Sequence, residues 1–184
     1  MPAIYDVPVA EFYNGKPITA DEWKILKLGN YWQFFISPTF AKLGTRSGRI
    51  QRVNNWLRWV AHQGNTTKRY LIYAVRWEHG EIGGRPHPHL FLGGMKDAKN
   101  QRSMCYILAT DWYKRHNSKI DVRVFERSLL GKAANYVAGV PRSDLDWAKN
   151  RYEIGKFGKA GFDNVHFSQH AEEVLQQMSG AAAA

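Results

Sequence analysis

The spacing of apolar residues along the chain predicts a series of strands and helices. Four segments rich in aromatic and β-branched residues are predicted strands: 31–37, 69–79, 87–92 and 120–125. Four segments with apolar residues at helical spacing are predicted helices: 48–63, 98–116, 128–139 and 168–178. Their order along the chain predicts an α+β fold, with a central antiparallel sheet of about five strands and helices packed on it.

Capping residues and prolines predict where these elements end. Ser47 is the predicted cap of the first long helix, which Gly64 ends, and Ser128 is the predicted cap of the short helix that follows the last strand. Pro86 and Pro88 lack the backbone N–H that a central strand donates. The strand that contains them is therefore expected at a sheet edge or with a bulge near its start.

The 184 residues fit one domain with terminal extensions. Residues 1–30 are rich in proline and glycine and predict a loop-rich N-terminal arm, with one helical turn between 19 and 28. Residues 31–141 form the predicted core, and residues 142–180 a basic C-terminal extension. The alanines at 181–184 resemble a tag or linker remnant.

Composition favours a polyanionic partner. The chain has 26 Lys and Arg against 16 Asp and Glu, a formal net charge of +10, which is typical of nucleic-acid-binding proteins. No apolar run is long enough to span a membrane, and no secretory signal is recognisable, so we expect a cytoplasmic protein with no membrane partner. Cys105 is the single cysteine, which excludes an internal disulfide, and its apolar neighbours predict a packing role.

Two histidines separated by one proline form the most informative candidate site. Side chains two apart on a strand share a face, so the imidazoles of His87 and His89 could reach one ion. Glu78, near the end of the preceding strand, is the favoured third ligand, with His79 and Glu81 as alternatives. Two imidazoles and one carboxylate leave open positions on Mg²⁺ or Mn²⁺ for phosphate oxygens and water.

Basic residues around this site are predicted to contact a nucleic-acid backbone. Arg76 shares a strand face with Glu78 and cannot ligate a metal, so it would point at the substrate. Residues 149–159 mix basic, aromatic and glycine residues and could form either a DNA clamp or a solubilising tail. The other predicted DNA-binding residues are Arg85, Lys149, Arg151, Lys156 and Lys159.

Tyr136 is the candidate nucleophile. It lies four residues after Lys132, so both side chains share one face of the predicted short helix. The residues expected to face the core are Leu129, Leu130, Ala133 and Val137. A phenol with a pKa of about 10 is a poor nucleophile at neutral pH, so a metal ion or the Lys132 ammonium would have to favour its phenolate. Ordinary packing is the alternative role of Tyr136, and Tyr152 is the alternative nucleophile.

Three motifs resemble those of HUH-type endonucleases, the rolling-circle replication initiators of small phages, plasmids and single-stranded DNA viruses. Residues 34–39 resemble the hydrophobic strand motif, Glu78 with residues 83–94 resembles the metal motif, and residues 135–139 resemble the nucleophile helix. The resemblance covers residues 31–140 and implies an RRM-like or ferredoxin-like nuclease fold.

The resemblance implies a metal-dependent single-stranded DNA endonuclease. His87, His89 and Glu78 would hold Mn²⁺ or Mg²⁺, and Tyr136 would attack a phosphodiester at an origin or stem-loop. The tyrosine would become linked to the 5′-phosphate and leave a free 3′-OH. Because the linkage conserves the bond energy, a later strand could be joined without ATP.

The chain departs from the family pattern after the tyrosine. Many members carry a lysine three or four residues later, where this chain has Gly139 and Val140. Lys132 is the predicted substitute, and a single-tyrosine mechanism follows. The chain also lacks a phosphate-binding loop for a helicase, so a host helicase or polymerase would be a further partner of this phage, plasmid or mobile-element protein.

Other classes of protein remain open. A non-catalytic RRM-like protein would bind single-stranded nucleic acid by stacking bases on Tyr31, Phe35, Tyr73 and Trp77. A double-stranded barrel metalloenzyme would need a glutamate soon after the histidine pair, which residues 90–94 lack. A transposase or relaxase would share the chemistry of a replication initiator.

Overall fold

The computed structural model describes residues 11–13, 16–42, 44–79, 86–97, 100–138 and 165–181. The chain forms two compact units. We call Tyr31–Phe125 with His166–Ala184 the sheet unit, and Met1–Asn30 with Glu126–Val165 the helix-pair unit. No helix in the described part of the chain combines the length and the apolar character needed to cross a bilayer.

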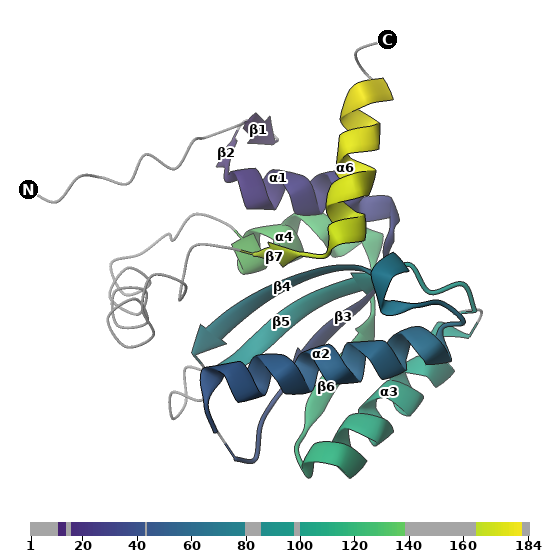
Figure 1. Ribbon diagram of the computed structural model, residues 1–184. Coiled ribbons are helices and arrows are strands. Elements are labelled where there is room, and N and C mark those ends of the chain that lie inside the picture. The colour runs from purple at the N-terminus through teal and green to yellow at the C-terminus, as the bar shows by residue number, and fades with distance from the viewer. Residues whose placement is uncertain are drawn as a thin grey trace, which may run out of the picture. The chain divides into compact units, whose positions relative to one another are not determined.

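The sheet unit is built on one antiparallel sheet (Figure 1). Its strands lie in the order β6 (Ile120–Val124), β3 (Trp32–Pro38), β5 (Pro86–Gly93), β4 (Ile72–His79) and β7 (His166–Phe167). The helices α2 (Arg46–Gln63) and α3 (Gln101–His116) follow β3 and β5 in the chain. The resulting β-α-β-β-α-β order, with β3 and β5 between β6 and β4, is the ferredoxin-like arrangement. The predicted α+β fold is confirmed.

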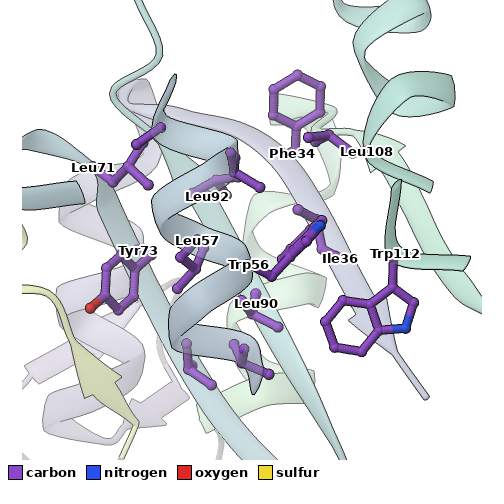
Figure 2. Close-up of a cluster of buried hydrophobic side chains, with 14 of the residues drawn as sticks. Phe34, Ile36, Trp56, Leu57, Leu71, Tyr73, Leu90, Leu92, Leu108 and Trp112 are labelled. Carbon is purple, nitrogen blue, oxygen red and sulfur yellow. The ribbon is translucent and has the colours of Figure 1, made fainter. Parts of the chain in front are cut away.

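One face of the sheet packs against α2 and α3 in a single apolar core (Figure 2). Trp56 and Leu57 of α2 lie over Leu90 and Leu92 of β5, and all four side chains are buried. Trp112 of α3 meets Trp56 edge to face, with ring centroids 5.3 Å apart. Large aromatic side chains of this kind contribute strongly to core stability. This core therefore fixes the sheet that carries the histidine pair.

The two prolines of β5 lie in a central strand, so the edge alternative of the prediction is wrong. The register shift in the β3–β5 pairing falls between Trp32 and Phe34, away from the start of β5. The register explains how they are tolerated. β5 pairs with β4 along its whole length, from Pro86 opposite His79 to Gly93 opposite Ile72. Its pairing with β3 covers only residues 90–93. The start of β5 is thus paired with β4 but not with β3. A proline can be tolerated there because no β3 strand is present to receive a hydrogen bond from the missing N–H.

The ends of α2 and α6 largely follow the sequence, although the predicted cap of α2 is corrected. Thr45, rather than Ser47, caps α2, because its Oγ1 accepts a hydrogen bond from the Gly48 N–H at 3.1 Å. Gly64 ends α2 as predicted. The last helix, α6 (Gln169–Ala181), begins after Ser168, whose Oγ accepts from the Ala171 N–H at 3.2 Å.

The helix-pair unit joins two segments from opposite ends of the sequence. Its N-terminal segment contains the paired strands β1 (Glu11–Tyr13) and β2 (Lys16–Ile18), then α1 (Ala20–Lys27) and the 3₁₀ turn η1 (Leu28–Asn30). Its second segment contains the 3₁₀ turn η3 (Arg127–Leu129) and α4 (Leu130–Ala138). α1 packs against α4. The predicted N-terminal arm is therefore the packing partner of the helix that carries Tyr136.

Two details of α4 differ from the sequence analysis. Ser128 lies within η3 and does not cap α4, which continues directly from that turn at Leu130. Leu129 is 45% exposed, so its expected core position is wrong. The predicted core position of Val137 is confirmed, and Ala134 and Ala138 are buried beside it.

Candidate functional site

The histidine pair lies on one face of β5, as the alternation of the strand requires. The ring centroids of His87 and His89 are 4.8 Å apart, and the rings are inclined by 79°. A metal–nitrogen bond of about 2.1 Å puts an imidazole centroid about 3.2 Å from the ion, so two neighbouring ligands have centroids about 4.6 to 5.3 Å apart. The observed spacing therefore fits two imidazoles on one ion.

His89 is held firmly by its surroundings. It is 5% exposed, and its ring stacks on Phe35 with the centroids 5.9 Å apart. The Oγ of Ser37, at the end of β3, lies 2.7 Å from Nδ1 of His89. A partner on Nδ1 fixes the ring orientation, and when Nδ1 is the donor it leaves Nε2 as the ligating nitrogen. This contact was not predicted from the sequence, although Ser37 lies within the first HUH-like motif.

The strand register brings the other candidates of β4 to the same face. Glu78 is the cross-strand partner of His87, and Arg76 is the partner of His89. Directly paired residues of an antiparallel sheet share a face. His79 pairs with Pro86 and belongs to the opposite face, so the register favours Glu78 over His79 as the third ligand.

A complete ligand set is not seen within the described side chains. Among them, no three His, Cys, Asp or Glu side chains are grouped so as to hold a metal ion. The side chain of Glu78 is outside that set, and its place is given by the backbone register alone. Two imidazoles and a carboxylate position on one sheet face have the donor chemistry of a divalent cation site.

Tyr136 and Lys132 belong to the helix-pair unit. Both side chains are exposed on α4, and the Tyr136 side chain is 57% exposed. Their shared face lies away from the buried residues Ala134 and Val137. The structure thus presents the phenol and the ammonium together on one helix surface.

Two polar contacts hold α4 against α1. The Asn135 Nδ2 donates to Oε1 of the buried Glu22 at 3.1 Å, one residue before Tyr136. The Thr19 Oγ1 donates to the carbonyl of Ala138 at 2.6 Å, at the end of α4. Neither contact was predicted, because the partners of Glu22 and Thr19 lie far away in the sequence. We infer that they position the helix carrying the candidate nucleophile.

Several predicted residues lie outside the described part of the chain. These include the alternative ligand Glu81 and the alternative nucleophile Tyr152. The predicted DNA-binding residues among them are Arg85, Lys149, Arg151, Lys156 and Lys159. Arg76 is described and is half-buried on β4.

The aromatic set of the RRM-like alternative is divided between the two sheet faces. Tyr73 is 6% exposed and belongs to the core under α2 and α3, and Trp77 packs against that core. Phe35 lies on the other face, beside His89. These residues therefore do not form the shared stacking surface that the alternative requires.

Cys105 is half-buried, and burial raises the pKa of its thiol, in keeping with a packing role.

Comparison with known proteins supplies no relative from which a role could be transferred. No family model, curated protein or solved structure matches this chain.

Proposed function

We propose that the protein is a metal-dependent single-stranded DNA endonuclease and strand transferase that initiates rolling-circle replication. It nicks an origin or stem-loop through a 5′-phosphotyrosine intermediate. The observation that supports this most strongly is the pair of imidazoles, 4.8 Å apart and opposite the backbone position of Glu78. The reaction belongs inside a host cell, with a phage, plasmid or other mobile element as the source of the gene.

In this proposal His87, His89 and Glu78 hold Mn²⁺ or Mg²⁺. When bound, the ion polarises the scissile phosphate and offsets the charge that grows in the transition state. Ser37 keeps the His89 ring oriented through the contact at 2.7 Å. Arg76, the partner of His89 across the strands, binds a substrate phosphate.

Tyr136 supplies the nucleophile. Its phenolic oxygen bonds to phosphorus while the bond from phosphorus to the 3′-oxygen breaks. The phenolic proton passes to solvent, and the departing 3′-oxygen takes up a proton to become the free 3′-OH. The ammonium of Lys132, exposed on the same helix face, favours the phenolate before attack. Reversal by a second 3′-OH joins strands without ATP.

A denaturing gel tests the nucleophile. The protein is incubated with Mn²⁺ and a labelled single-stranded oligonucleotide carrying its replicon origin, and a shifted covalent adduct is expected. Tyr136→Phe should abolish this adduct. The matched control is Tyr106→Phe, which alters a tyrosine that is 75% exposed on α3 and should leave the adduct unchanged. An undiminished adduct in Tyr136→Phe would refute the assignment.

Metal titration tests the histidine pair. His87→Ala should lose Mn²⁺ binding and cleavage but keep most of its DNA affinity, because backbone charge supplies most non-specific binding. His62→Ala is the control, since His62 is exposed on α2 and outside the pair. A protein that binds DNA equally well in EDTA and never forms an adduct under any metal would instead be a non-catalytic binder.

A further inference from the structure

A long acid-free segment contributes much of the positive charge of the sheet unit. From Tyr31 to Trp77 the chain contains eight Lys and Arg residues and no Asp or Glu. They are Lys42, Arg46, Arg49, Arg52, Arg58, Lys68, Arg69 and Arg76. Three of the arginines recur every third residue from the start of α2. This concentration of one sign of charge is a feature separate from the histidine pair.

The arginines at the start of α2 form one cluster with the preceding loop. Arg49 is 5% exposed, and its Nη1 donates to the carbonyl of Gly44 at 2.9 Å. The Nη1 of Arg52 donates to the carbonyl of Lys42 at 3.4 Å. Burial, followed by the charges of Arg46 and Arg52, lowers the pKa of Arg49. The positive fields of the three guanidinium groups therefore overlap.

The positive field of Arg52 reaches the end of α3. Burial, followed by the charges of Arg52 and Arg115, lowers the pKa of His116, while Asp111 opposes the effect. Arg115 itself pairs with Asp111 at 2.6 Å. The N–H and Oγ1 of Thr39 both donate to the carbonyl of Lys119, at 2.9 and 2.7 Å. These bonds tie the loop before α2 to the turn after α3.

The chemistry of this surface favours a phosphodiester backbone. The first turn of a helix favours anions, yet α2 has arginines and no acidic residue there. The exposed positions between the arginines are polar, with Ser47 and Gln51 among them. Hydroxyl and amide groups beside arginines are common phosphate contacts, whereas a lipid-binding helix would also expose large apolar side chains.

The cluster lies at the end of the sheet that carries the histidine pair. β3 ends at Pro38, next to Ser37 with its contact to His89, and the following loop leads into α2. Phe40 of that loop stacks on Trp77 near the end of β4, with the centroids 6.0 Å apart. Figure 1 shows α2 beginning at this end.

We propose that Lys42, Arg46 and Arg52, here called the arginine surface, bind the phosphodiester backbone of nucleic acid as a contact additional to the histidine face, while the buried Arg49 adds its charge from below. The inference rests on the proposed function for one point, which is that the bound polyanion is nucleic acid. The surface would hold DNA flanking the nicked phosphate. Its contribution would be independent of base sequence and strongly dependent on salt.

Salt-dependent binding tests this surface. The full chain is titrated with fluorescent oligothymidylate in EDTA, so that cleavage plays no part. In Arg46→Gln/Arg52→Gln, the slope of log affinity against log salt should fall by about 1.4, and binding should weaken roughly 25-fold at about 0.1 M salt. The matched control is Arg58→Gln/Arg69→Gln, which removes two exposed arginines of the same unit and should change binding little.

Each other outcome would overturn the inference. Equal losses in the two double variants would show a general effect of net charge, and no loss in either would remove the surface from binding. Loss of binding to anionic lipid vesicles with DNA binding intact would assign the surface to a membrane. Arg46→Lys/Arg52→Lys keeps the charge and should keep the slope, which separates lost contacts from misfolding.

The salt-dependence result for the arginine surface can be distinguished from the adduct result for the proposed nuclease. A reduced slope together with no covalent adduct would refute the nuclease and leave the arginine surface standing. An adduct that forms on Tyr136 together with an unchanged slope would do the reverse.

Discussion

The two units of the molecule are held together in different ways. In the sheet unit, Trp56, Trp112 and Leu90 are almost completely buried in one apolar core. The helix-pair unit also buries apolar residues of α1 and α4, but its specific links are polar, from Asn135 to Glu22 and from Thr19 to the end of α4. Hydrophobic burial gives general stability, whereas a buried polar contact is costly when only one partner remains.

This difference divides the proposed chemistry. The candidate metal ligands are on a sheet fixed by a large core, and the candidate nucleophile is on a short helix positioned by a few polar contacts. We therefore expect substitutions in the sheet unit to change the global stability and the candidate metal site. Substitutions in the helix-pair unit should change mainly the order of α4.

The largest effect is expected in the core. Trp112→Ala should reduce the free energy of unfolding of the sheet unit by about 3 to 5 kcal/mol, because it removes a fully buried ring and leaves a cavity. Urea denaturation followed by circular dichroism measures the change. The neighbouring Tyr113→Ala is the control, since Tyr113 is 58% exposed and should cost far less. Similar losses for both would show that the core does not dominate.

A smaller effect is expected on metal affinity. Ser37→Ala removes the hydroxyl at Nδ1 of His89 and should weaken Mn²⁺ binding about tenfold to hundredfold, since partners of ligating histidines orient the ring. Isothermal titration calorimetry measures it. Ser37→Thr retains the hydroxyl and should recover most of the affinity. Unchanged binding in Ser37→Ala would remove Ser37 from the site.

The polar link in the helix-pair unit should matter locally. Asn135→Ala leaves the buried Glu22 without this donor and should destabilise the packing of α4 on α1 by about 1 to 3 kcal/mol. Hydrogen exchange should show faster opening of α1 and α4 with little change in β4 and β5. Ser128→Ala, in the turn before α4, is expected to have almost no effect. Equal acceleration in both units would contradict the division.

A pH effect on stability is expected from His116 in the sheet unit. Because its folded-state pKa is lowered, His116 binds protons more weakly when folded than when unfolded. Its contribution to stability is complete above the unfolded pKa of about 6.5 and is lost as the pH falls through the folded pKa. Chemical denaturation across this range should show a smaller loss of stability in His116→Gln. An identical pH profile would contradict the assignment.

The local periodicities of the sequence predicted much of the fold. Aromatic alternation located β3, β4, β5 and β6 but not the short strands β1, β2 and β7. Counting by twos put Glu78 and Arg76 on one face, which is the face of the histidine pair in the register. Composition could not decide whether a strand aromatic packs or stacks bases, and Tyr73 and Trp77 proved to belong to the core side.

Contacts distant in sequence could not be predicted. Glu22 and Asn135 are 113 positions apart, and no local pattern marks either as a partner of the other. The choice of Thr45 over Ser47 as a cap depends on the backbone at the helix start. The central place of β5 depends on how far β3 extends beside it, which its own prolines do not reveal.

The central claim is that Tyr136 of the helix-pair unit forms a covalent bond to DNA in a metal-dependent reaction. Tandem mass spectrometry of the protease-digested covalent adduct tests it most directly. We predict a nucleotide attached through its 5′-phosphate to the peptide that contains Tyr136. This modified peptide should be present with Mn²⁺ and absent in EDTA or in His87→Ala. A nucleotide on any other residue, or an adduct that forms equally in EDTA, would contradict the account.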